Sequence, residues 1–464
     1  MADLQTALDA IKAKLPDCQR YTNYYNGKHE LSFASDKFRT AFGETLRSMR
    51  DNLCPIIVDA PADRMEIVNF SGDKPDAQSA VADAAWKLWQ RENLELVSND
   101  VHKEALKCGI GYVIVWSDAE GKLAQFYAQD SRQCVVIENA NTNKPLYGAK
   151  QWLTDAKYIR VTLYYPDRIE KYISRKSYDG SAHDNLKESS FTFVAPDSGE
   201  EAIIPNPYGV IPMFRFKTNP VLNDAIPIQD ALNKTICDKL VAMEFSAFRQ
   251  RWATGLTPPM NEITGNPELP FKAGADRLWF TTEEGVKFGE FGTTDLQQFL
   301  NVADSYRLEM ARVSGTPLYF FAIDTSDSMS GEALKTLESR FVKRVKRLSI
   351  NFGSVWSDAM EFALAIEGSG GADNITAQWE NPEQRSEKET CETLLLKQKL
   401  GIPDNVLQEE LGYTAEDIAK FEKEKERKAQ LALERMQEAG TNPAQAATNG
   451  DGSPPRSPVF GRTE

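Results

Sequence analysis

The stretch 334–366 carries apolar side chains in unbroken steps of three and four, and it constrains the fold more than any other part of the chain. Such spacing places the apolar positions on one face of an α-helix. Ser330 stands where an N-cap residue is expected, and the Gly368-Ser-Gly-Gly run would end the helix. A helix of that length spans about 50 Å, so a large body of chain must pack along it. The apolar positions are Leu334, Leu337, Phe341, Val345, Leu348, Phe352, Val355, Ala359, Phe362 and Ile366.

The loop that precedes this helix supports two interpretations. Asp324, Ser326 and Ser328 fit the pattern D-x-S-x-S, the first metal loop of von Willebrand A-type domains, in which carboxylate and hydroxyl oxygens bind a cation such as Mg²⁺. Such a domain needs alternating strands and helices after the loop, whereas the following residues read as helix, helix and tail. The pattern therefore favours the second interpretation, a Ser- and Asp-rich loop that caps a helix.

Composition excludes several classes of protein. The 464 residues are enough for two or three core-forming regions. The net charge of −14 argues against a protein that grips nucleic acid over its whole surface, but it allows one along which DNA must slide. Six scattered cysteines indicate buried thiols in a reducing compartment, with neither a zinc site nor disulfides. Because no leader and no apolar run of about 18 residues stands out, we expect assembly in the cytosol without a membrane.

Residues 1–220 predict an α+β region. A helix over 2–15 should break at Pro16, and a helical pair over 77–108 should turn at Asn93 and Asn99. Beyond this pair the apolar period changes from 3.6 to 2, which indicates a mostly antiparallel meander. The polar interval 175–201 is expected to be a surface excursion. The predicted strands are 112–116, 123–127, 134–137, 158–165 and 169–173.

Residues 226–313 predict a helical hairpin. Apolar stripes indicate one helix over 226–254 and a second over 295–313. The residues between them, 256–292, are rich in Pro and Gly and look β-like around 277–280. Each helix has only one apolar stripe, so neighbouring copies of the chain are expected to complete the burial.

The C-terminal part predicts further helices and a tail. A leucine-rich helix is expected over 391–400, and a charged, solvated helix over 414–438. Asn, Ala, Gly, Ser and Pro then dominate without any periodicity, so residues 441–464 are expected to be disordered.

Five short segments together resemble the portal proteins of tailed bacteriophages, in the long-tailed branch. Each segment is short, and the match comes from their order and spacing. Two of them have the form YYxGxH and RxNxxPxxVD. The segments are Tyr21-Thr-Asn-Tyr24-Tyr25-Asn26-Gly27-Lys28-His29, the run from Asp51 to Arg64, Asn206-Pro-Tyr208-Gly209-Val-Ile-Pro212, Gln229-Asp230-Ala-Leu-Asn233 and Ser330-Gly331-Glu332-Ala333-Leu334.

The resemblance implies a portal fold with named regions. In the family's terms, Leu318-Tyr-Phe-Phe321 is unusually apolar for a tunnel loop, so part of that loop should be packed and only Asp324–Met329 should face DNA. The implied regions are a wing of mixed helix and sheet (1–220), stem helices (221–255 and 293–313), a small β-containing clip (256–292), a tunnel loop (314–331), a long body helix with a return to the wing (332–385), a helical crown (386–440) and the disordered tail (441–464).

The implied function is mechanical. A ring of about twelve copies would occupy one capsid vertex of the virion, and double-stranded DNA would pass through it during packaging and ejection. The implied partners are the terminase large subunit, the major capsid and scaffolding proteins and the head–tail adaptor. Since no Walker, Rossmann or nucleophile-elbow motif is found, we expect no catalysis and no cofactor. The energy for DNA movement would come from a separate ATPase.

Candidate channel-lining residues follow from this reading. Acidic side chains on the second stem helix would repel phosphates and keep the duplex centred, and sparse basic ones would guide it. The alternative is that these charges form ion pairs between subunits. Two other functions remain open: the metal-dependent adhesion module described above, and a hydrolase with an unrecognised carboxylate site. The candidates are Asp295, Asp304, Glu309, Arg312, Asp324, Ser326, Asp327 and Ser328.

Overall fold

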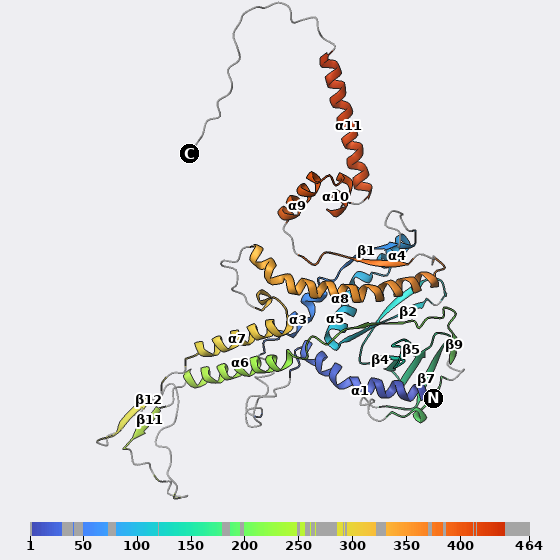
Figure 1. Ribbon diagram of the computed structural model, residues 1–464. Coiled ribbons are helices and arrows are strands. Elements are labelled where there is room, and N and C mark those ends of the chain that lie inside the picture. Colours follow the sequence, from blue (N-terminus) through green and yellow to red (C-terminus); the bar gives the residue numbers. More distant parts are fainter. Residues whose placement is uncertain are drawn as a thin grey trace, which may run out of the picture. The chain divides into compact units, whose positions relative to one another are not determined.

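The computed structural model describes two compact units, Met1–Pro382 and Glu383–Glu464, and each is considered by itself (Figure 1). Ser330, the tail 441–464 and the candidates Asp324, Ser326, Asp327 and Ser328 lie outside the described residues. The described residues are 2–29, 40, 50–72, 80–118, 120–178, 186–194, 199–247, 251–255, 260, 265, 285–290, 292, 295–321, 331–369, 374–383, 387–411, 413 and 415–440.

The first helix, α1 (Ala2–Tyr25), runs through Pro16, so the predicted break is wrong. A proline inside a helix costs about 3 kcal/mol. Burial on both sides offsets this cost, because Leu8 and Ile11 belong to one hydrophobic cluster and Tyr24 to another. The helix therefore links two parts of the core.

The predicted helical pair is present, with one turn instead of two. Asn93 lies between α4 (Ala80–Arg91) and α5 (Leu94–Cys108) with a positive φ of 51°, as expected for a turn. Asn99 lies inside α5, so the prediction of a second turn is wrong. The helix continues there because Val101 and other residues of one face are buried in the core.

All strand pairs in the two larger sheets are antiparallel, as predicted. The prediction of a surface excursion over 175–201 is wrong in its middle, because Phe191 is buried and its strand pairs with β7. The strand that contains Phe191 has only three residues, which are too few to show an alternating pattern in the sequence. One sheet has the order β10-β2-β3 and the other β4-β5-β6-β7-β8, with β9 also on β7. The strands are β2 (Ile110–Ser117), β3 (Ala124–Gln129), β4 (Cys134–Glu138), β5 (Pro145–Leu153), β6 (Tyr158–Tyr164), β7 (Arg168–Ser177), β8 (Phe191–Phe193), β9 (Ile203–Pro205) and β10 (Met213–Lys217).

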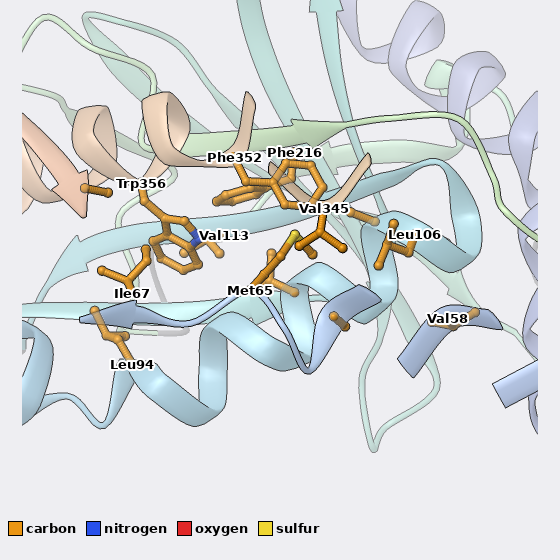
Figure 2. Close-up of a cluster of buried hydrophobic side chains, with 14 of the residues drawn as sticks. Val58, Met65, Ile67, Leu94, Leu106, Val113, Phe216, Val345, Phe352 and Trp356 are labelled. Atoms are coloured by element: carbon orange, nitrogen blue, oxygen red, sulfur yellow. The ribbon is translucent and has the colours of Figure 1, made fainter. Parts of the chain in front are cut away.

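The long helix is confirmed as α8 (Gly331–Ile366), and it ends at Gly368 with φ +67°. Figure 2 shows two of its side chains, Phe352 and Trp356, beside Phe216 in the main core. From Glu338 onward, α4, α5, β2, β3 and β10 pack against it, and so does a small antiparallel sheet of β1 (Ile67–Gly72) and β13 (Ile375–Trp379).

The predicted hairpin is present as α6 (Ile226–Ala247) and α7 (Gln297–Ser314), which lie side by side (Figure 1). The prediction that the first helix extends to 254 is wrong. Instead β11 (Arg251–Thr254) pairs with β12 (Lys287–Glu290), so the sheet begins before the turn signal at Gly255. Residues 251–254 thus pair with a strand more than thirty residues later in the sequence, where a last helical turn was predicted.

The second unit contains the two predicted helices, α9 (Glu387–Lys399) and α11 (Ala415–Gly440), and an unpredicted short one, α10 (Asp404–Glu410). A few buried residues, among them Leu394, Leu407 and Ile418, form its small apolar interior. No described helix in either unit is both long and apolar enough to cross a membrane. The fold is α+β, as predicted.

Candidate functional site: the helical hairpin and its root

Three distant sequence segments meet where α6 begins. The hydroxyl of Tyr24 donates to Asp230, at 2.8 and 2.9 Å from its two carboxylate oxygens, and both residues are buried. A buried carboxylate is costly unless it is hydrogen-bonded. Tyr24 of the first resemblance segment therefore stabilises the buried carboxylate of Asp230, which lies in the fourth.

A histidine links the same segments. The Asn233 amide nitrogen lies 2.7 Å from Nδ1 of His29, and since an amide nitrogen can only donate, Nδ1 accepts. Its Nε2 then carries the proton and lies 3.1 Å from two acceptors, the Asn52 side-chain oxygen and the Tyr24 carbonyl. Burial lowers the pKa of His29, which agrees with a neutral ring. Both ring nitrogens of His29 are thus used in hydrogen bonds within the fold.

Two side chains of α6 hold the backbone of 51–53. Gln229 accepts from the Leu53 N–H at 2.9 Å and donates to the Asp51 carbonyl at 2.5 Å. Asn233 accepts from the Asp51 N–H at 3.3 Å. Gln229 is fully buried, so this polar side chain belongs to the interior of the fold.

Asp51 also connects this backbone to the second helix of the hairpin. Its carboxylate lies 2.9 Å from Nη2 of Arg307, whose Nη1 lies 2.8 Å from Asp304. Both helices are thus fixed to one short segment by hydrogen bonds with defined directions, and a satisfied polar network of this kind specifies a unique geometry. We call this set the hairpin root: Tyr24, His29, Asp51, Asn52, Gln229, Asp230, Asn233 and Arg307.

The predicted lining residues lie on α7 and just before it, and all four described ones are exposed. Asp295 accepts from the Gln297 N–H at 2.9 Å, at the start of the helix. Asp304 pairs with Arg307 of its own chain, so this carboxylate has an ion-pair partner without a neighbouring subunit. Glu309 and Arg312 are exposed further along α7.

A buried ion pair between Arg64 and Glu338 of α8 lies against Tyr319, in the first part of the predicted tunnel loop. Arg64 and Glu338 lie 3.2 Å apart with side chains only 10% and 7% exposed. The Tyr319 hydroxyl bonds to Glu338 and accepts from Arg64, and burial together with the Glu338 hydrogen bond raises the pKa of Tyr319 to about 12. Phe321 is buried, as expected for a packed part of the loop, whereas Leu318 is exposed.

The sequence reasoning missed the roles of these groups. It identified the five segments as a resemblance but did not predict that three of them meet at the hairpin root. The available signal was a cluster of amide and acidic side chains, Gln229, Asp230 and Asn233, at the start of a largely apolar helix. Their partners are about 180 residues away in the sequence, so no local pattern could identify them.

Comparison with known proteins assigns the family. The model for phage portal proteins of the SPP1 Gp6-like kind matches residues 4–431. The portal protein of Mycobacterium phage L5 is 22% identical over 391 residues, which cover 78% of this chain and 74% of that protein. The portal protein of Mycobacterium phage D29 is 24% identical over 406 residues, covering 82% and 79%.

Two solved structures are also similar, both at 13% identity with 78% of this chain and 88% of theirs covered. They are the neck of a native gene transfer agent particle with C12 symmetry (TM-score 0.44) and the neck of an empty one with C6 symmetry (TM-score 0.45). The family match over nearly the whole length makes this chain a phage protein. It belongs to the SPP1 Gp6-like family of phage portal proteins.

The alternative of a metal-dependent von Willebrand A module finds no support in these comparisons. Among the described elements, α8 is followed by one strand and three helices, not by the alternation that such a domain requires. The D-x-S-x-S residues themselves are outside the described part of the chain.

Proposed function

We propose that this portal protein forms a closed ring of about twelve copies at one capsid vertex, through which double-stranded DNA is packaged and ejected. The observation that carries the ring is the uneven burial of the hairpin. Gln229, Asp230 and Leu232 near the start of α6 are buried, whereas none of the described α6 side chains after Cys237 is.

Apolar side chains are exposed on the half of the hairpin that lies away from its root, late in α6 and early in α7. Met243 is 46% exposed, Leu300 42% and Val302 44%. Burying apolar area contributes about 25 cal/mol per Å², so contact between neighbouring hairpins would stabilise an assembly. A contact between different faces of identical subunits closes into a ring when the rotation between them allows it.

The proposed bore is lined in part by α7. Exposed carboxylates such as Asp304 and Glu309 would repel phosphates, and Arg312 would supply an isolated attraction. Tight basic contacts would arrest the duplex, because every neutralised phosphate releases counterions and adds affinity. A mostly acidic lining with few cations therefore suits a channel through which DNA slides.

The regions are proposed on the same basis. Residues 1–220 with the β13 return form the wing, α6 and α7 the stem, 256–292 the clip, 314–331 the tunnel loop and 386–440 the crown. The chain has no catalytic role in this proposal. The terminase large subunit supplies the energy for packaging, and the adaptor replaces it afterwards.

Negative-stain electron microscopy of the full chain tests the ring. We expect rings with a central hole, and we expect Val302→Asp to shift them towards monomers because it places a charge in the proposed contact. Val68→Asp is the matched control, since Val68 of β1 is equally exposed at 44% and lies away from the hairpin. A native protein that stays monomeric, or equal effects of both variants, would refute the ring contact.

Charge reversal tests the lining. Asp304→Lys should reduce DNase-protected DNA in a packaging assay several-fold while rings still form, because each added cation attracts the duplex. Asp304→Asn, which can still bond to Arg307, separates the lining role from loss of the ion pair. Glu120→Lys, in the exposed turn after β2, changes the net charge equally and should package normally. Unchanged packaging by Asp304→Lys would remove the lining role.

A further inference from the structure

A cavity of about 360 Å³ lies between the two larger sheets, on a face that the proposed function does not use. Tyr112, Ile114 and Met213 of the first sheet pack with Cys134 and Val136 of the second in a small hydrophobic cluster. Ile114 belongs both to this cluster and to the cavity lining, so the two sheets meet there and the cavity opens beside the contact.

Side chains alternate along the strands, so one face of the second sheet packs in a hydrophobic core and the other face lines the cavity. Ala149 and Val161 pack in the cluster that contains the first half of α1. Lys150 and Trp152 of β5 and Arg160 of β6 point to the opposite face and line the cavity. This face is therefore built from cationic and aromatic residues where a sandwich core would hold aliphatic ones.

The aromatic part of the lining is large. Trp116 and Tyr127 come from the first sheet, and Trp152 and Tyr164 from the second. Aromatic rings supply rigid contact area at a small entropic cost and are typical of recognition surfaces. The volume suits one or two side chains of a bound molecule.

The charged part of the lining is basic in a chain of net charge −14. Lys150, Arg160 and Lys171 contribute three positive charges, and Glu200 contributes one negative. Glu200 lies 2.8 and 2.9 Å from the Arg160 guanidinium and 3.6 Å from Lys171. The Lys150 ammonium lies 5.1 Å from the centre of the Trp152 ring. Nε of Arg160 is buried and has no hydrogen-bond partner within the described part of the chain. The cavity lining therefore offers one hydrogen-bond donor, Nε of Arg160, and an excess of two positive charges.

We propose that this cavity binds an acidic, extended peptide segment of a partner protein, with one apolar side chain against the aromatic rings and a carboxylate facing Lys150. An extended peptide is favoured because β3, which borders the cavity through Tyr127, has only β2 beside it among the described strands. Such an edge can hydrogen-bond a further strand. A nucleic acid is less suited, because Glu200 would face its phosphates and the cavity holds too few groups for a strand.

Fluorescence anisotropy of the full chain tests this proposal. The probe is a fluorescein-labelled, end-capped peptide with one phenylalanine between aspartates. We expect saturable binding that weakens with added NaCl, and at least about tenfold weaker binding to Lys150→Glu. Lys144→Glu is the matched control: Lys144 lies in the exposed turn between β4 and β5 and does not line the cavity.

Other probes decide the ligand class. A peptide with lysines in place of aspartates should not bind, and labelled oligothymidylate should bind more weakly than the acidic peptide. Tighter oligothymidylate binding that Lys150→Glu abolishes would make this a nucleic-acid site and overturn the peptide assignment. No binding at millimolar peptide, or equal binding by Lys150→Glu and the native protein, would also overturn it. Lys150→Gln, which keeps the stem of the side chain, replaces Lys150→Glu if circular dichroism shows that the latter is misfolded.

Discussion

Between pH 7 and pH 4, the free energy of unfolding should fall about 3 kcal/mol more in the native protein than in a His102→Gln variant. His102 is fully buried, and burial lowers its pKa from 6.5 to about 3. Its Nε2 accepts from the indole N–H of Trp356 at 2.9 Å, and its ring stacks on Phe352. Because an indole nitrogen only donates, the imidazole must be neutral with its proton on Nδ1.

The direction of this pH dependence follows from the number of protons that the folded and unfolded states bind. Below pH 6.5 the histidine of the unfolded chain takes up a proton, whereas the buried His102 stays neutral down to about pH 3. The unfolded state therefore binds more protons in this window, and acid favours it. The contribution is fully present above pH 6.5 and is lost progressively towards pH 3.

Urea unfolding at pH 7, 6, 5 and 4, followed by tryptophan fluorescence, measures the difference in slope. Trp356→Phe is the control, because it removes the hydrogen bond but retains the buried imidazole. It should be less stable at pH 7 and still show the steep acid dependence. Parallel pH curves for the native protein and His102→Gln would show that His102 is not the group responsible.

Glu338→Ala should destabilise the first unit by about 3–5 kcal/mol, because it leaves the buried guanidinium of Arg64 without its carboxylate. The hydroxyl of Tyr319 loses a partner at the same time. Replacing the pair together, as Arg64→Met with Glu338→Leu, removes both charges and should cost much less. Thermal unfolding of the two variants measures the difference.

A second measurement separates loss of the ion pair from loss of packing. Glu338→Gln keeps the volume and a hydrogen-bond acceptor for Tyr319 but not the charge, so its stability should lie between those of the native protein and Glu338→Ala. If Glu338→Ala were no less stable than the double variant, Arg64 would have to reach water when unpaired. The buried pair would then contribute little to the stability of the first unit.

Local patterns predicted the elements whose signal lies within one segment. The steps of three and four along 334–366 predicted α8, and the change of period after Gly109 predicted five strands, because burial of one face imposes those spacings. The same patterns were wrong at Pro16, within 175–201 and at 251–254. At each of these places a partner distant in sequence decided the conformation.

The candidate site divides in the same way. The exposed positions of Asp304, Glu309 and Arg312 follow from the apolar stripe of their helix, and the sequence could place them there. The partners in the hairpin root could not be predicted, because Gln229 and Asn233 bond to residues about 180 positions earlier. The pairing of Asp304 with Arg307 also depended on the side-chain directions in the folded protein.

The sequence by itself determined the α+β class, the long helix, the hairpin and the family resemblance, since these depend on residue type and spacing along one segment. Only the tertiary structure decided which polar side chains are buried and what they bond to. The physical reason is that a buried donor or acceptor is stable only with a partner, and that partner can come from any part of the chain.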